Sequence, residues 1–262
     1  MNKNKKSLLW QIINPSSERV SYLFGTIHVW DDRAVALVEK VLPFVEQCDL
    51  YCAETNLDDL AAFGSSISFL PDNQTLNDFF KPKKMIKIKK MAERILQTPF
   101  SYVERLQPMI LANLMSAAMI APCHQVSMDE LLWKKASASG KQMFGVESAE
   151  MQMSIFQKIS IEQQSEQLLS IVENVKKNAR QLKKLSSLYA DSDIHALYSN
   201  SKKNLKSLRK PLLYDRNKKM TATIKDLATH KNAFFAVGAA HLSGEKGIIH
   251  LLKKEGFIVK PI

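Results

Sequence analysis

Two Gly-x-x-His motifs, one near each end of the chain, carry the residue types best suited to metal chemistry. The first is Gly25-Thr26-Ile27-His28 and the second is Gly238-Ala239-Ala240-His241, and each follows an apolar run typical of a buried strand. Glycine lets the backbone turn sharply at the end of a strand, and the histidine three residues later points back over that end. A lone histidine in this position is more often a hydrogen-bonded structural residue. The matched pair instead predicts two arms of one metal site, with His28 and His241 as ligands.

Short apolar runs and helical spacing define the elements that must position these arms. Strands are expected at Leu8–Ile13, Val20–Ile27, Leu50–Glu54, Lys141–Val146, Ala233–Val237 and Phe257–Lys260. Helices are expected at Ala34–Gln47, Lys81–Leu96, Met109–Ile120, Met128–Ala138, from Ala149 to about Leu188 as one long helix, at Arg216–Thr229 and at Gly247–Glu255. Glycine is absent between Gly64 and Gly140 and between Gly145 and Gly238, so these two stretches should be mainly helical.

These elements predict an α/β (α+β) fold in which a mixed β-sheet is formed by the N- and C-terminal segments. The chain is expected to be a single domain over residues 1–262, since no low-complexity linker interrupts it. The sheet core should comprise about residues 1–60, 140–148 and 212–262. A large central helical insertion should occupy about 61–139 and 149–211.

The composition is that of an ordinary globular protein, with 45% hydrophobic and 24% charged residues. Its three cysteines, Cys48, Cys52 and Cys123, have no disulfide-framework spacing and favour a reducing compartment. The basic start Met1–Lys6 resembles the head of a signal peptide, but no small-residue cleavage site follows. The apolar stretch Pro108–Pro122 is shorter than the roughly 20 residues of a membrane span and is expected to be a buried helix. We therefore expect a soluble, cytoplasmic protein.

The net charge of +11 comes mainly from lysines that cluster at Lys81–Lys90, Lys176–Lys184 and Lys202–Lys219. Apolar residues follow helical spacing between the lysines of the first cluster, so the lysines should coat a solvated outer face. The basic residues are not interleaved with aromatic residues, and no nucleic-acid-reading motif is present. An anionic partner surface remains compatible with this charge.

Several short motifs in fixed order extend the pattern over nearly the whole chain. They are Leu8-Leu9-Trp10, Tyr22-Leu23-Phe24-Gly25-Thr26-Ile27-His28, Ala53-Glu54, Met128-Asp129, Glu147-Ser148-Ala149-Glu150-Met151-Gln152, Arg216-Asn217 and Val237–Gly247 with its second Gly-x-x-His. In this order and spacing the chain resembles the TraB/GumN family, which includes the Tiki proteases that cut Wnt proteins. It departs from the usual family pattern at Asn56, Ser127 and Val146.

The resemblance implies a metal-dependent, peptidase-like site. Matched position by position, the functional residues of Tiki-type members correspond to His28, His241, Glu54 and Arg216. In the strand pattern, Glu54 follows the buried run Tyr51-Cys52-Ala53 and Glu147 follows another strand. The ends of such strands are where sites form in α/β folds.

The residue chemistry agrees with that implication. Two neutral imidazoles and one carboxylate leave a coordination position open for water, as in catalytic rather than structural metal sites. Glu54 is the candidate third ligand or general base, and Glu147 competes for both roles. Arg216 is a candidate to stabilise an oxyanion or to hold a substrate carboxylate. Zinc suits such ligands, whereas a more carboxylate-rich set suits manganese or cobalt. Asn217, next in the chain, is interpreted as a helix cap.

The sequence therefore predicts a metal-dependent hydrolase, most simply a peptidase, that binds a divalent ion (Mn, Co or Zn) through His28, Glu54 and His241. Glu54, Glu147 and Arg216 are the candidate catalytic residues. The expected partner is a peptide or small-molecule substrate, and no oligomeric state is favoured. The alternative is a non-catalytic binding or regulatory protein that keeps the histidines for architecture and binds its partner through the basic surface.

Overall fold

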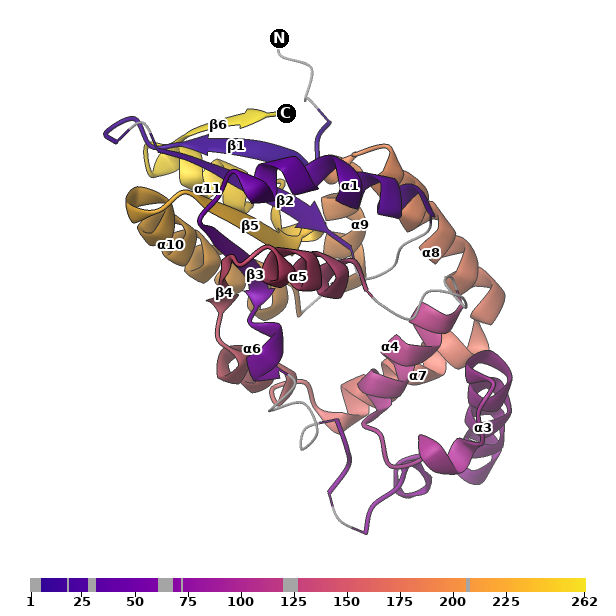
Figure 1. Ribbon diagram of the computed structural model, residues 1–262. Helices are drawn as coiled ribbons and strands as arrows, with labels where there is room; N and C mark the ends of the chain where they lie inside the picture. The colour runs from indigo at the N-terminus through magenta and orange to yellow at the C-terminus, as the bar shows by residue number, and fades with distance from the viewer. Residues whose placement is uncertain are drawn as a thin grey trace.

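The fold is built on a six-stranded mixed sheet with strand order β4-β3-β5-β2-β1-β6 (Figure 1). The computed structural model describes residues 6–17, 19–27, 32–60, 68–71, 73–119, 127–205 and 208–262. The strands are β1 (Leu9–Ile13), β2 (Val20–Thr26), β3 (Leu50–Thr55), β4 (Gln142–Glu147), β5 (Ala233–Gly238) and β6 (Ile258–Pro261). All six strands expected from the apolar runs are confirmed, with ends shifted by a residue or so.

The central strands β4, β3, β5 and β2 are parallel, while β1 and β6 add an antiparallel edge. The register pairs Thr55 with Glu147 at the end of β3 and β4, and Thr26 with Gly238 at the end of β2 and β5. The carboxyl ends of the four parallel strands therefore lie at one edge of the sheet. In α/β sheets this edge is where ligands bind.

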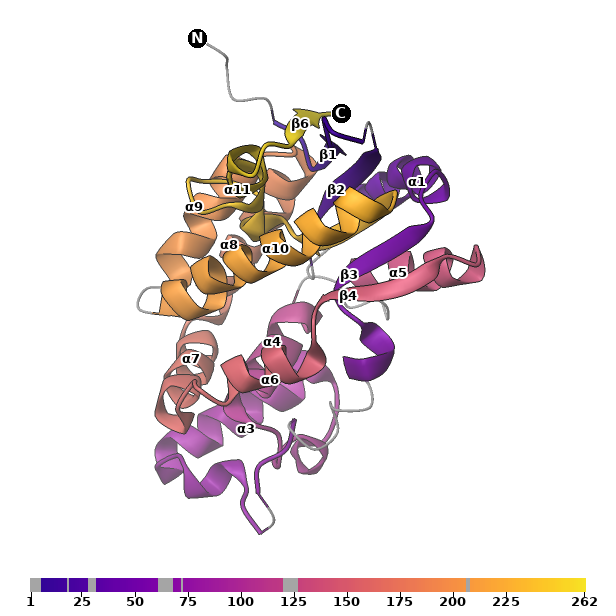
Figure 2. The ribbon, with the colours of Figure 1, turned by 90° about the vertical axis from the view of Figure 1, so that its left-hand side faces the viewer.

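Helices cover both faces of the sheet. Helices α1 (Asp32–Glu46) and α5 (Met128–Ala138) contact β5, β3 and β4 from one side, whereas α10 (Asp215–His230) and α11 (Ile248–Lys254) contact β4, β5 and β6 from the other (Figure 2). This double cover explains why β5 is buried along almost its whole length, since parallel strands between two helical layers read as continuous apolar runs. Inside this core the ring of Tyr51 stacks on Phe234 with centroids 5.9 Å apart.

A second apolar cluster lies beyond the carboxyl ends of the parallel strands. It is formed mainly by α3 (Pro82–Leu96), α4 (Pro108–Ala118) and α7 (Ile161–Glu173), with the short turns η1 (Leu76–Asp78) and η2 (Phe100–Tyr102) at its margin (Figures 1 and 2). The expected buried helix at Pro108–Pro122 corresponds to α4, whose Leu111, Ala112 and Met115 are fully buried. Nowhere in the described ranges does a helix have both the length and the apolar character needed to cross a bilayer.

The expectation of one long helix from Ala149 to about Leu188 is wrong. That stretch is divided into α6 (Ala149–Phe156), α7 and α8 (Val175–Ala190), and α9 (Ile194–Leu205) follows. Ser160 starts α7 with a capping box in which Gln163 bonds back to the Ser160 backbone, and Asn174 leaves helical geometry at φ −127°. Ser and Asn bond readily to nearby backbone, so they interrupt a helix that apolar spacing alone would continue.

Two of the three cysteines lie in the described part of the chain. Cys48 and Cys52 are free, buried thiols. Cys123 lies outside the described residues.

Candidate functional site

The carboxyl ends of β3, β4 and β5 bring three of the sequence-predicted segments together. Glu54 lies next to the last residue of β3, Glu147 is the last residue of β4, and Gly238 is the last residue of β5. His241 follows in the short helical turn η5 (Ala239–His241). Arg216 reaches the same edge from the first turn of α10. His28 follows β2 in the sequence but lies outside the described residues.

Arg216 binds both carboxylates. Its Nε and Nη2 donate to Oε2 of Glu147 at 2.8 and 2.6 Å, and Nη2 also donates to Oε1 of Glu54. The Glu147 side chain is 1% exposed, whereas Glu54 and Arg216 retain 18% and 14%. Glu147 therefore lies behind Arg216, while Glu54 keeps contact with the open side of the site.

Burial and ion pairing have opposite effects on the pKa values of Glu147 and Arg216. Burial raises the pKa of the Glu147 carboxyl above its ordinary value, and the hydrogen bond and charge of Arg216 offset part of that rise. For Arg216, burial opposes the charged form, but the two carboxylates outweigh it and raise the guanidinium pKa. Oε1 of Glu147 is buried and has no hydrogen-bond partner among the described residues.

Glu54 is further oriented by two neighbours. The backbone N–H of Gly238 donates to its Oε2 at 2.9 Å, and Nε2 of Gln152 donates to its Oε1 at 3.3 Å. The first bond links the end of β3 to the end of β5, and the second links β3 to α6. The carboxylate of Glu54 is thus held in one orientation at the point where three elements meet.

His241 is oriented by Asn217 on α10. Nδ1 of the imidazole lies 2.5 Å from Oδ1 of Asn217, and Nδ2 of the same amide donates to the carbonyl of Lys246 at 2.6 Å. Because Nδ2 is turned to a carbonyl, the amide oxygen is the atom that faces the ring, and Nδ1 must carry the proton. The lone pair of the neutral imidazole is then on Nε2. Such a partner on one nitrogen is the usual way in which proteins fix the tautomer of a metal-binding histidine.

Asn217 was interpreted from the sequence as a helix cap, and this is wrong. It is fully buried in the first turn of α10, and no side chain caps that helix. Asn217 is nonetheless part of the Arg216-Asn217 pair, which is one of the motifs that carry the family resemblance. That pairing was the only sequence signal for its role.

Gly238 lies against the side chains of both Glu54 and His241. A β-carbon placed on Gly238 would lie 3.3 Å from Oε2 of Glu54 and 3.4 Å from Cδ2 of His241. Its backbone has φ −52°, which any residue can adopt, so a larger side chain at this position would be limited by these two neighbours and not by backbone strain.

The turn that carries His241 is supported from α9. Oγ of Ser243, two residues after η5, lies 2.6 Å from Nδ1 of His195 on α9, and α9 also packs on η5. Gly244, at φ +91°, places its backbone against the ring of Tyr198. The segment that follows His241 is therefore held in place by α9.

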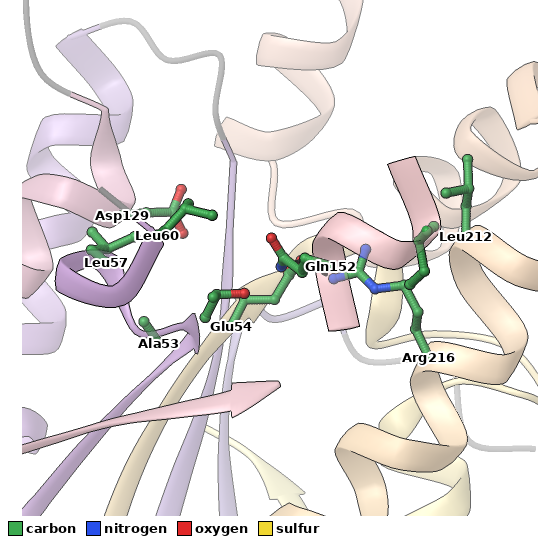
Figure 3. Close-up of a pocket in the computed structure, with 10 residues that line it drawn as sticks. Ala53, Glu54, Leu57, Leu60, Asp129, Gln152, Leu212 and Arg216 are labelled. Atoms are coloured by element: carbon green, nitrogen blue, oxygen red, sulfur yellow. Dashed lines mark hydrogen bonds and ion pairs between the residues drawn. The ribbon is translucent and has the colours of Figure 1, made fainter. Parts of the chain in front are cut away.

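A cavity of about 190 Å³ opens beside Glu54. Figure 3 shows Glu54 at its centre, with Leu57, Leu60 and Asp129 on one side and Gln152, Arg216 and Leu212 on the other. Glu147 and His241 do not line it. Of the two candidate catalytic carboxylates, only Glu54 faces this space.

Metal-binding donors are incomplete within the described ranges, which leave out His28. Among those residues no group of three His, Cys, Asp or Glu side chains is arranged to hold a metal ion. Two of the three predicted ligands, Glu54 and His241, lie close to Gly238.

Known proteins resemble this chain along almost its full length. The sequence model of the TraB/PrgY/gumN family matches residues 8–261. A protein of Amphimedon queenslandica named "Metalloprotease TIKI homolog" is 23% identical over 322 aligned positions, which cover 98% of this chain and 62% of the relative. "Metalloprotease TIKI1" of Danio rerio is 25% identical over 316 positions, covering 97% and 63% respectively.

The chain thus spans a little less than two thirds of the length of these relatives. No solved structure matches it. The family match and the order of the motifs confirm the resemblance drawn from the sequence, and the chain belongs to the TraB/PrgY/gumN family.

Proposed function

We propose that the protein is a metal-dependent peptidase whose site is formed at the carboxyl ends of the parallel strands. The observation that carries the proposal is the convergence of Glu54 and His241 on Gly238, since a β-carbon at that position would be in contact with both side chains. The names of the distant relatives as metalloproteases support the same chemistry.

The donor atoms fit a divalent ion. The Nε2 lone pair of His241 is defined by the Asn217 contact, and Glu54 supplies carboxylate oxygen. With His28 from the first Gly-x-x-His motif, the set becomes two imidazoles and one carboxylate, which suits Zn, Co or Mn. When bound, the ion would lower the pKa of a water molecule and polarise a substrate carbonyl.

Arg216 is proposed to stabilise developing negative charge rather than to bind a substrate carboxylate. Its Nε and Nη2 are occupied by Glu147 and Glu54, whereas Nη1 makes no hydrogen bond to a described residue. Arg216 lines the cavity, so Nη1 is the donor available to a substrate oxygen. Two carboxylates outnumber the one guanidinium, so the cluster disfavours a third carboxylate from a substrate.

Glu147 is proposed as a positioning residue for Arg216. It accepts two hydrogen bonds from the guanidinium and is almost completely buried, so it has no surface from which to act on a substrate. Glu54 then takes the carboxylate role at the site itself. It is the metal ligand, and it is the carboxylate adjacent to the cavity.

The test combines metal content with peptide cleavage. Purified full-length protein is analysed by elemental mass spectrometry and then incubated with Mn²⁺, Co²⁺ or Zn²⁺ and a mixture of unrelated peptides, whose products are read by mass spectrometry. About one equivalent of one ion and discrete cleavage products are expected. His241→Ala should lose both, while the matched control His230→Ala, an exposed histidine at the far end of α10, should keep both.

A wild-type protein that binds none of the three ions and leaves every peptide intact would contradict the proposal. The non-catalytic alternative would then stand, and the basic surface would become the region to study.

A further inference from the structure

We propose that the cavity beside Glu54 is a specificity pocket for one apolar side chain of the substrate, on the residue next to the cleaved bond. This inference rests on the proposed peptidase function and adds the substrate class to it. The pocket would favour side chains of the size of Leu, Ile or Met and disfavour both Ala and charged residues.

Aliphatic side chains from separate segments form the wall. Leu57 and Leu60 follow β3, Ile155 comes from α6, and Leu212 comes from the π-helical turn η4 (Lys210–Tyr214) that leads into α10. All four are only half-buried, because they border open space rather than the filled core. Aliphatic surface left exposed in a concave site gains free energy when an apolar group of the ligand covers it.

The size of the cavity indicates how much ligand it accepts. Its volume of about 190 Å³ is below the roughly 300–1,000 Å³ typical of pockets that enclose a whole small-molecule ligand. A single medium-sized side chain is therefore the appropriate occupant, with the peptide backbone lying across the opening. That arrangement would place the neighbouring amide next to Glu54 and Arg216, which border the same cavity (Figure 3).

The charges at the wall argue against acidic occupants. Glu54 and Asp129 line the cavity, and the only cation among the described residues that line it, Arg216, already pairs with Glu54 and Glu147. A substrate carboxylate would meet like charges without a compensating partner. A lysine would be attracted by the carboxylates but would lose hydration against the leucines, so a basic preference is the main competing outcome of the test.

Binding can be measured without cleavage. The full-length protein is labelled with ¹³C at Ile and Leu methyl groups, loaded with Zn²⁺, and titrated with N-acetyl N-methylamides of Leu, Met, Ala, Asp and Lys. The Leu and Met compounds should give saturable shifts at the methyls of Ile155 and Leu212. Their affinity should exceed that of the Ala compound by at least about tenfold, as expected for lost methylenes in an apolar pocket.

Two variants test whether these shifts report the cavity. Leu212→Trp should fill it and abolish binding of the Leu compound, whereas Leu212→Ala should enlarge it and shift the preference towards the N-acetyl N-methylamide of Phe, which is added to the series for this variant. Leu114→Trp is the matched control, since Leu114 is 44% exposed on α4 and does not line the cavity. Circular dichroism confirms that each variant is folded. If only one of the two Leu212 variants folds, that variant alone is a sufficient test of the pocket, because a definite change in binding is expected for each.

The outcomes separate this inference from the proposed function. Binding of Leu and Met compounds without cleavage of any peptide would support the pocket and contradict the peptidase. Cleavage with no apolar preference on either side of the broken bond would support the peptidase and overturn the pocket. The pocket would also be overturned by tighter binding of the Lys or Asp compound, or by the absence of shifts at Ile155 and Leu212 with every compound.

Discussion

The Oδ1 atom of Asn217 lies 2.5 Å from Nδ1 of His241, so the first turn of α10 determines which nitrogen of this histidine carries the proton. The same helix turn supplies Arg216 to the two glutamates. One segment thus orients both the proposed ligand and the proposed oxyanion donor, which places strong demands on the position of α10 relative to β3 and β5.

Replacing Asn217 should weaken metal binding although Asn217 is not a ligand. In Asn217→Ala the ring of His241 loses its partner on Nδ1, and loss of such a partner typically costs about 10- to 100-fold in metal affinity. The buried Nδ1 of His241 is then left without its acceptor and the carbonyl of Lys246 without its donor, so the free energy of unfolding should fall by about 1–3 kcal/mol. Calorimetric titration with Zn²⁺ and urea unfolding measure the two effects. Asn204→Ala, an exposed asparagine on α9, is the control, and an unchanged zinc affinity in Asn217→Ala would refute the orienting role.

Substitution of Glu54 and substitution of Glu147 should have different effects on metal affinity. Glu54→Gln removes a proposed ligand and should lower metal affinity strongly. Glu147→Gln should leave metal affinity nearly unchanged, yet lower kcat, since Arg216 loses its buried anchor. It should also reduce the free energy of unfolding by about 1.5–3 kcal/mol, the range for hydrogen bonds to charged groups. Zinc titration, peptide turnover and urea unfolding distinguish the two, with Glu150→Gln on the exposed side of α6 as the control. A Glu147→Gln protein that loses its metal would show that Glu147, not Glu54, is the ligand.

Gly238→Ala should damage the site more than the fold. The new methyl group would lie 3.3 Å from Oε2 of Glu54, so this carboxylate would have to shift slightly, and it would contact the ring of His241 at 3.4 Å, while the backbone at φ −52° accommodates alanine. Overpacking of this kind costs about 1–3 kcal/mol. We expect a clear loss of metal affinity with a folded circular dichroism spectrum. Wild-type metal affinity would mean that Glu54 and His241 do not need to approach each other at this glycine.

The thiol of Cys48 should react very slowly with iodoacetamide in the folded protein. Burial raises its pKa to about 12, while the charge of Lys141 lowers it and that of Asp49 raises it by smaller amounts. Because the thiolate is the reactive form, its alkylation rate should rise about tenfold per pH unit from about pH 8 upwards without reaching a plateau near pH 9. In guanidinium chloride the thiol has its ordinary pKa, so the alkylation rate should already increase with pH at lower pH values and should level off above that pKa. Mass spectrometry of the Cys48 peptide measures both, and a plateau near pH 9 in the folded protein would contradict the burial effect.

Most of the sheet could be predicted from the sequence, but only part of the candidate site could. Strands such as Ala233–Gly238 were predictable because a sheet covered on both faces requires uninterrupted apolar runs. The break between α7 and α8 was missed because helical spacing continues through Asn174, and only its local backbone geometry ends the helix. Glu54 and Arg216 were found as candidates, but their contact joins positions 162 apart in the sequence. Periodicity carries no information about such a pairing.

The difference between the two glutamates was also beyond the sequence. Both follow a strand, and only the packing of Arg216 over β4 places one of them at the cavity and the other beneath the guanidinium. Asn217 was misread for a related reason. Its type suits a helix cap, and the partner that gives it another role lies in a distant turn.

The pairing of β2 with β5 has a consequence for how the chain is made. The backbone N–H of Ala233 donates to Oγ of Ser21 across a separation of 212 positions, and among the described strands β5 is the one parallel neighbour of β2. During synthesis the β1–β2 hairpin therefore leaves the ribosome long before the strand that completes its sheet. The apolar surface of the hairpin stays uncovered until that strand has been synthesised. Such non-local pairing slows folding and leaves hydrophobic surface exposed to aggregation. The nascent chain should consequently depend on chaperones until β5 has emerged.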